Sequence, residues 1–127
     1  MTRIRVFLAD GDDIDLPGRA SALAAKPMIE VIGTTSDGNV ALQRIAAERP
    51  DLVVLDVRLA PMGGFEVARQ IKAAGGGPVV VLMSHHVGEL AQRAAAGAGA
   101  DLMLPKTAMV DGVAALALRM SAGIPMD

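Results

Sequence analysis

Four polar residues stand where apolar runs of this sequence end, and their chemical types suit phosphoryl chemistry. They are Asp10, Asp56, Ser84 and Lys106. Two carboxylates at one rim repel each other unless a cation lies between them, and hard oxygen ligands suit Mg²⁺ or Mn²⁺. A lysine and a hydroxyl beside them would balance the charge of a phosphoryl group and donate hydrogen bonds to it. Asp56 could then be the nucleophile that forms an acyl phosphate.

Apolar runs and helical patterns alternate along the whole chain and must position these four residues. We expect strands at residues 4–9, 29–34, 52–56, 79–83 and 101–104. Helices are expected around 17–25, 88–96 and 107–120, after Gly38 and closed before Arg49, and from about Phe65 to the glycines at 75–77. Such alternation requires a parallel sheet with helices on both faces. The carboxyl ends of parallel strands converge on one crevice, so the four polar residues are expected to become neighbours.

Composition narrows the classes of protein that the chain can represent. Its 127 residues suit one domain. The sequence has no cysteine, which excludes disulfides and thiolate metal sites and favours a cytoplasmic location. A formal charge of −2 with mixed signs argues against direct binding of nucleic acid. No apolar stretch approaches the roughly 20 residues that span a bilayer, so we expect no membrane segment.

From Ile4 to about Met120 the chain resembles the receiver domain of two-component response regulators. Five segments carry the resemblance: Val6–Asp10, Pro27–Gly33, Ser36–Leu42, Arg49–Asp56 and Gly99–Lys106. The second and third are most similar to receivers that precede a helix-turn-helix DNA-binding domain. The resemblance implies a flavodoxin-like, doubly wound α/β fold, with a five-stranded parallel sheet of strand order 2-1-3-4-5 and five helices. Residues 1–127 would form a single receiver domain with its core at about 4–120.

The same resemblance implies a role for each site residue. Asp56 would be the phosphoacceptor, and a histidine kinase or phosphotransfer protein of a phosphorelay would be the donor. Lys106 would contact the phosphoryl group, and Ser84 would supply the switch hydroxyl. Mg²⁺ would be held by Asp10, Asp56 and the backbone carbonyl of Arg58. The chain would not be an enzyme, apart from catalysing its own phosphorylation and dephosphorylation.

Phosphorylation in this family shifts a two-state equilibrium and remodels the face made by the fourth helix, the fifth strand and the fifth helix. We therefore expect the output to be a change of protein partner. The partner would be a separate downstream protein or a C-terminal effector domain missing from this chain. Homodimerisation through the same face is a further hypothesis.

Several residues depart from the family pattern. Gly11 stands where receivers carry a second acid after the first strand, so we expect Mg²⁺ to bind weakly, with Asp12 as a candidate substitute ligand. The switch hydroxyl is ambiguous, because counting forward from Pro78 places Met83 at its position, whereas counting back from Lys106 places Ser84 there. Met103 occupies the position on the fifth strand that is usually aromatic.

Because of these departures, two other functions are consistent with the sequence. The main alternative is a pseudo-receiver, a protein–protein interaction module that works without phosphorylation. A third hypothesis is an unrelated aspartate-dependent phosphotransferase or hydrolase on a similar sheet. That activity would need a second acid two residues beyond Asp56, where Arg58 stands, and a cap insertion for which the loops are too short.

Overall fold

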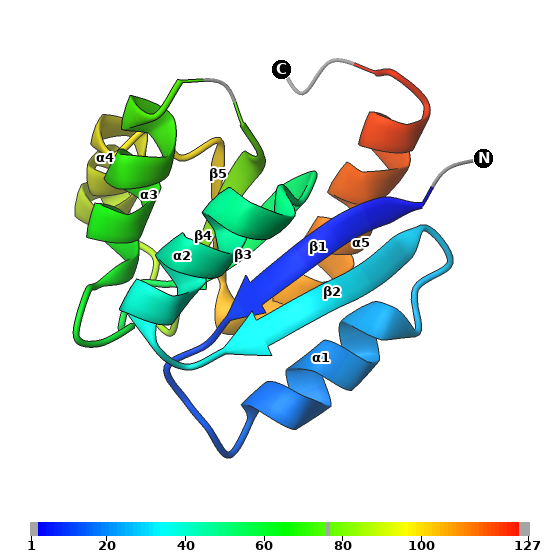
Figure 1. Cartoon of the computed structure of the whole chain (residues 1–127), viewed down its shortest axis with the longest axis horizontal. Coiled ribbons are helices and arrows are strands. Elements are labelled where there is room, and N and C mark those ends of the chain that lie inside the picture. Colours follow the sequence, from blue (N-terminus) through cyan, green and yellow to red (C-terminus); the bar gives the residue numbers. More distant parts are fainter. Residues whose placement is uncertain (1–2, 76, 125–127) are drawn as a thin grey trace.

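The computed structural model describes residues 3–75 and 77–124, so the outermost residues of the predicted 1–127 domain lie outside it (Figure 1). Strands and helices alternate along the described chain. The strands are β1 (Ile4–Ala9), β2 (Ile29–Thr35), β3 (Leu52–Asp56), β4 (Val79–Ser84) and β5 (Leu102–Pro105). The helices are α1 (Leu16–Ala24), α2 (Gly38–Glu48), α3 (Gly64–Ala73), α4 (Glu89–Gly97) and α5 (Met109–Ser121).

The strands form one parallel sheet in the order β2-β1-β3-β4-β5. This confirms the predicted fold class, strand order and alternation of elements. Observed boundaries of the strands, and of α1 and α4, lie within one residue of the predicted ones. The last helix differs more, because Lys106–Ala108 form a 3₁₀ turn before α5 begins at Met109.

Side chains of the central strands alternate between two apolar layers. Every residue of β3 is buried, as expected for a strand covered on both faces. Leu52 and Val54 belong to the layer under α1 and α5, whereas Val53 and Leu55 belong to the layer under α2, α3 and α4 (Figure 1). Because successive strand residues point to opposite faces, Asp56 falls on the α1 and α5 side.

Polar contacts fix both ends of α2 beside the sheet. Asp37 caps its first turn by accepting a hydrogen bond from the backbone N–H of Val40 at 3.0 Å. At the other end, the guanidinium of Arg5 on β1 donates to the carbonyls of Glu48 and Arg49 at 2.9 and 2.8 Å. These contacts satisfy backbone groups that helix ends otherwise leave unpaired.

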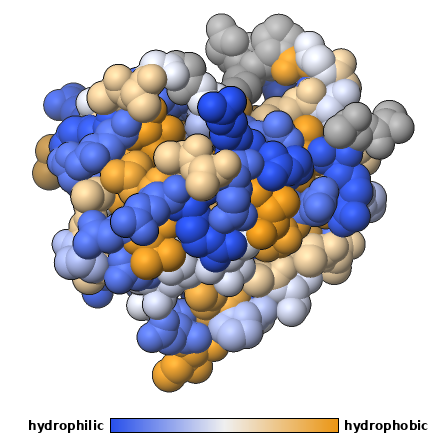
Figure 2. All heavy atoms as spheres, viewed as in Figure 1, coloured by the Kyte–Doolittle hydropathy of each residue, from blue (hydrophilic) through white to orange (hydrophobic). Residues whose placement is uncertain are grey.

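The surface is mixed in character. Figure 2 shows hydrophobic patches separated by hydrophilic side chains on the face that it presents. Ala95 of the alanine-rich α4 and Ala98, which follows the helix, are buried in the core, whereas Ala94 is exposed. Leu90 of α4 and Leu118 of α5 are exposed apolar side chains.

Within the described part of the chain, no helix combines the length and apolarity that crossing a membrane requires.

Candidate functional site

Three of the four predicted site residues meet at the carboxyl end of the sheet. Lys106 Nζ lies 3.0 Å from Asp10 Oδ1 and 2.7 Å from Asp56 Oδ2. These are the buried polar or charged residues of the described chain, with exposures of 0%, 1% and 7% for Asp10, Asp56 and Lys106. Burying a charge is unfavourable unless it is paired, and a single ammonium here serves two carboxylates.

The two carboxylate oxygens of Asp56 have different numbers of partners. Oδ2 accepts the N–H of Gly11 at 2.9 Å in addition to the Lys106 ammonium. Oδ1 accepts the N–H of Arg58 at 3.0 Å. A carboxylate oxygen has two lone pairs, so Oδ1 keeps more accepting capacity than Oδ2.

Asp10 is bound by a residue that the sequence reasoning missed. Arg19 Nη1, from α1, lies 2.7 Å from Asp10 Oδ2. Oδ1 of Asp10 also accepts the backbone N–H of Asp12 at 3.0 Å. The side chain of Arg19 is 19% exposed, whereas that of Asp10 is fully buried. Asp10 therefore contacts two cations, one from each end of the chain.

These contacts set the protonation states of the buried groups. Burial alone would raise the pKa of Asp10, but the hydrogen bonds from the Asp12 backbone, Lys106 and Arg19 outweigh it and lower that pKa below its ordinary value. Burial alone would lower the pKa of Lys106, but its bonds to Asp56 and Asp10 raise that pKa. Asp10 is therefore ionised, and Lys106 charged, at neutral pH.

The side chain of Asp12 faces its own loop. Its Oδ1 accepts the backbone N–H groups of Ile14 and Asp15 at 3.1 and 3.2 Å. Hydrogen bonding from Asp15 is the main reason that the pKa of Asp12 is lowered. Such short-range bonds are typical of aspartate in turns. The candidate substitute ligand is thus engaged in shaping the loop before α1.

Strand register separates the two candidates for the switch position. Met83 pairs with Asp56 across β3 and β4, is fully buried, and belongs to the apolar layer under α1 and α5. Ser84 is the next residue, pairs with Pro105 and is half-buried. Alternation directs Ser84 to the opposite face of the sheet from Asp56. The position facing the acid cluster from β4 is therefore occupied by a thioether.

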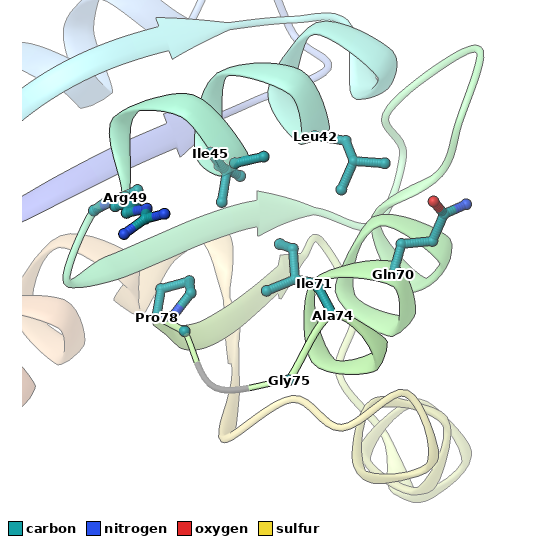
Figure 3. A pocket seen from close by; sticks show the side chains of 11 residues that line it. Leu42, Ile45, Arg49, Gln70, Ile71, Ala74, Gly75 and Pro78 are labelled. Atoms are coloured by element: carbon teal, nitrogen blue, oxygen red, sulfur yellow. The ribbon is translucent and has the colours of Figure 1, made fainter.

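A cleft of about 490 Å³ opens over the acid cluster. Its lining consists of Gly11, Asp12, Asp13, Ile14, Asp56, Arg58, His85 and Lys106. A second cavity, of about 510 Å³, lies between α2 and α3 near the amino ends of β3 and β4 (Figure 3). Its lining side chains include Leu42, Ile45 and Ile71 but no carboxylate. The polar groups that converge on one point thus lie at the first cleft.

The fold and site agree with what comparison to known proteins finds. Residues 6–117 match the response regulator receiver domain, and the chain belongs to that family. It is 38% identical over 115 residues to a protein-glutamate methylesterase/protein-glutamine glutaminase of Nocardioides sp., a match that covers 89% of this chain and 31% of that protein. The transcriptional regulatory protein LiaR of Bacillus subtilis is 30% identical over 122 residues, covering 96% of this chain and 58% of LiaR.

A solved structure shows the same similarity. The signal receiver domain of NarL from Mycobacterium tuberculosis superposes with a TM-score of 0.84 and 30% identity, over 93% of this chain and 98% of that one. This confirms the predicted family and its likeness to receivers of transcriptional regulators. The chain is a receiver of two-component signalling, and the pseudo-receiver alternative is not favoured.

The names of these relatives contradict the prediction that the protein is not an enzyme. Several of them are named as protein-glutamate methylesterases/protein-glutamine glutaminases. The physical reason is that a receiver's own residues do not encode the kind of output that it controls. The chain spans 31% of the length of the Nocardioides relative and less than two thirds of LiaR.

Receiver domains generally bind Mg²⁺ at the phosphorylation site, but the residues present here do not fit that ion. Arg19 and Lys106 already contact the carboxylate of Asp10. A Cβ added at Gly11 would lie 2.5 Å from the Arg58 carbonyl oxygen, so the loop covers that implied ligand. In the described chain, no three His, Cys, Asp or Glu side chains are grouped to hold a metal.

Proposed function

We propose that Asp56 is the phosphoacceptor of this receiver and that Lys106 stabilises the incoming phosphoryl group. The observation that carries the proposal is the buried ammonium of Lys106, 2.7 Å from Asp56 Oδ2, at the floor of a polar cleft. Preorganised charge in a site of low dielectric stabilises developing phosphoryl charge without reorganisation. Ser84 stays a candidate switch hydroxyl, and its half-buried position at the last residue of β4 would require a local turn of the backbone.

The proposed reaction follows from the hydrogen bonds of Asp56. Oδ1, the less committed oxygen, attacks the phosphorus atom, and the bond from phosphorus to the donor breaks with its electron pair leaving on the donor. A carboxylate nucleophile needs no base, so no proton has to be removed from Asp56. The Arg58 N–H holds the attacking oxygen in place. The ammonium of Lys106 shifts from Oδ2 toward the new phosphoryl oxygens.

The signalling context extends this proposal. A histidine kinase or phosphotransfer protein would supply the phosphoryl group, in the cytoplasm, to one receiver domain spanning 1–127 with its core at about 4–120. The greater length of the relatives supports an effector domain or separate partner downstream. Exposed Leu90 on α4 and Leu118 on α5 support an output or dimer contact through α4, β5 and α5. We expect no direct binding of nucleic acid by this chain.

The strength of Mg²⁺ binding belongs to the same proposal. Mg²⁺ would bind weakly, because Gly11 replaces the second acid of the family and Arg19 contacts Asp10. Asp10, Asp56, the Arg58 carbonyl and Asp12 are the groups that such binding could recruit. The three carboxylates already accept hydrogen bonds within the protein.

Acetyl phosphate followed by intact mass spectrometry tests the proposal. We expect one phosphoryl adduct on the wild-type chain and none on Asp56→Asn. The matched control is Asp51→Asn, an exposed aspartate just before β3 whose Oδ2 accepts the N–H of Arg5 at 2.8 Å. This control should label like wild type. Labelling of Asp56→Asn, or no labelling of wild type while a conventional receiver labels in parallel, would overturn the proposal.

A further inference from the structure

The charges of the buried site balance without an added ion. Asp10 and Asp56 contribute two negative charges, and Lys106 and Arg19 contribute two positive charges through contacts of 2.7 to 3.0 Å. A receiver with a second acid after β1 would carry three negative charges against one lysine and would need a divalent cation. Here Gly11 removes one negative charge and Arg19 supplies one positive charge. The two differences together offset the two charges of a metal ion.

The loop before α1 is built around this arrangement. Gly11 presses against the Arg58 carbonyl so closely that a Cβ would lie 2.5 Å from that oxygen and 3.3 Å from Asp56 Oδ2. Its N–H instead points at Asp56 Oδ2 at 2.9 Å. A backbone donor thus faces Asp56 from the position where the family places a carboxylate, which further lowers the site's need for a cation.

Two carboxylates fix the guanidinium of Arg19 beside the site. It projects from α1, and the carboxylate of Asp15, one helical turn away, lies 3.7 Å from the same Nη1 atom. A guanidinium stays charged at every physiological pH and carries five N–H donors in a rigid plane, which suits it to carboxylate and phosphoryl oxygens together. The fully buried carboxylate of Asp10 holds one edge of the guanidinium, so Arg19 acts on the site through Asp10.

We propose that Arg19 is a built-in counter-cation that takes the place of the divalent metal, so that Asp56 is phosphorylated without Mg²⁺. The inference rests on the proposed function, because it concerns the same phosphoryl transfer. Asp56 Oδ1 forms the new oxygen–phosphorus bond, the bond between phosphorus and the acyl oxygen of acetyl phosphate breaks, and acetate leaves with the electron pair. Total charge is conserved, no proton is transferred, and no further reactant is needed.

Labelling by acetyl phosphate in EDTA and in Mg²⁺, followed over time by intact mass spectrometry, tests the inference. For the wild type we expect rates that agree within about twofold in the two conditions, since preorganised charge is already present. Arg19→Gln should label more slowly in EDTA than wild type, because Asp10 loses the cation that balances its charge. It should also gain stimulation by Mg²⁺, because Asp10 Oδ2 becomes free to bind a cation.

Two further variants separate charge from structure. Arg19→Lys keeps the positive charge and should retain more activity in EDTA than Arg19→Gln. Arg69→Gln, which removes an exposed arginine paired with Glu66 on α3, should match wild type in both conditions. Thermal unfolding of each variant shows whether the fold persists. A loss of labelling caused only by unfolding would appear equally in EDTA and in Mg²⁺.

The outcomes distinguish this inference from the proposed function. Wild-type labelling that requires Mg²⁺ would overturn the role of Arg19 and leave Asp56 as phosphoacceptor. The same holds if Arg19→Gln labels in EDTA as fast as wild type. No wild-type labelling in either condition, with a conventional receiver labelled alongside, would overturn the proposed function and this inference with it.

Discussion

Replacing Gly11 with alanine tests how tightly the loop before α1 is packed on the site. The added Cβ would lie 2.5 Å from the carbonyl oxygen of Arg58 and 3.2 Å from its carbonyl carbon. Both atoms belong to the backbone that leaves β3, so they cannot rotate away as a flexible side chain would. The loop itself must therefore retreat, and the N–H of Gly11 must move away from Asp56 Oδ2.

The size of the effect follows from this contact. Overpacking against rigid surroundings costs about 1–3 kcal/mol. Unfolding entropy of about 2.1 cal/mol/K per residue gives about 0.27 kcal/mol/K for 127 residues, so about 2 kcal/mol lowers the Tm by about 7 °C. Loss of the Gly11 hydrogen bond to Asp56 acts in the same direction.

Thermal unfolding followed by circular dichroism measures this change, and Gly18→Ala is the matched control. Gly18 lies in α1, and a Cβ there would meet nothing within 4 Å. Alanine is favoured over glycine in a helix by about 0.5–1 kcal/mol, so this control should raise the Tm by about 2–4 °C. A Gly11→Ala Tm at or above that of wild type would refute the close packing of this loop on Arg58.

Three further predictions concern the charged site and the helix ends. Lys106→Met should lower the free energy of unfolding in urea by about 3–5 kcal/mol, because buried carboxylates lose their shared cation; a change below about 1 kcal/mol would contradict the pairing. Asp37→Ala should cost about 1 kcal/mol through loss of the α2 cap, and an unchanged urea midpoint would argue against that cap. The lowered pKa of Asp10 stabilises the fold above its unfolded pKa, and that stabilisation disappears as pH falls through the folded value. Asp10→Asn should therefore flatten the acid limb of a stability profile below about pH 4, and equal slopes would contradict the ion pairs.

Much of the fold was predictable because its signals are local and repeated. The continuous apolar run Leu52–Leu55 could only be buried on both faces, and the fold rules for parallel strands then bring Asp10, Asp56 and Lys106 to one edge. The boundary before α5 was less predictable. Lys106 begins a 3₁₀ turn, and its side chain contacts two carboxylates that lie far away in the sequence, which helical periodicity does not reveal.

Arg19 shows where sequence reasoning reaches its limit. The helix that carries it was predicted, but the path of the loop between Asp10 and α1 decides which helical side chain faces the site. Hydrogen bonds such as those of Asp12 to Ile14 and Asp15 set that path. One sequence signal bears on Arg19: the loss of the second acid at position 11 weakens metal binding, which leaves room for a cation supplied by the protein. The choice between Met83 and Ser84 likewise needed the strand register.

The close approach of Gly11 to the Arg58 carbonyl also limits how this sequence can evolve. An acidic residue at position 11 would bring a Cβ into the backbone that follows β3, so that single step is disfavoured while the loop keeps its present course. Losing Arg19 alone would leave Asp10 with one cation fewer. If Arg19 acts as the counter-cation, a metal site would return only when both positions change, and we expect them to be exchanged together with the intervening loop.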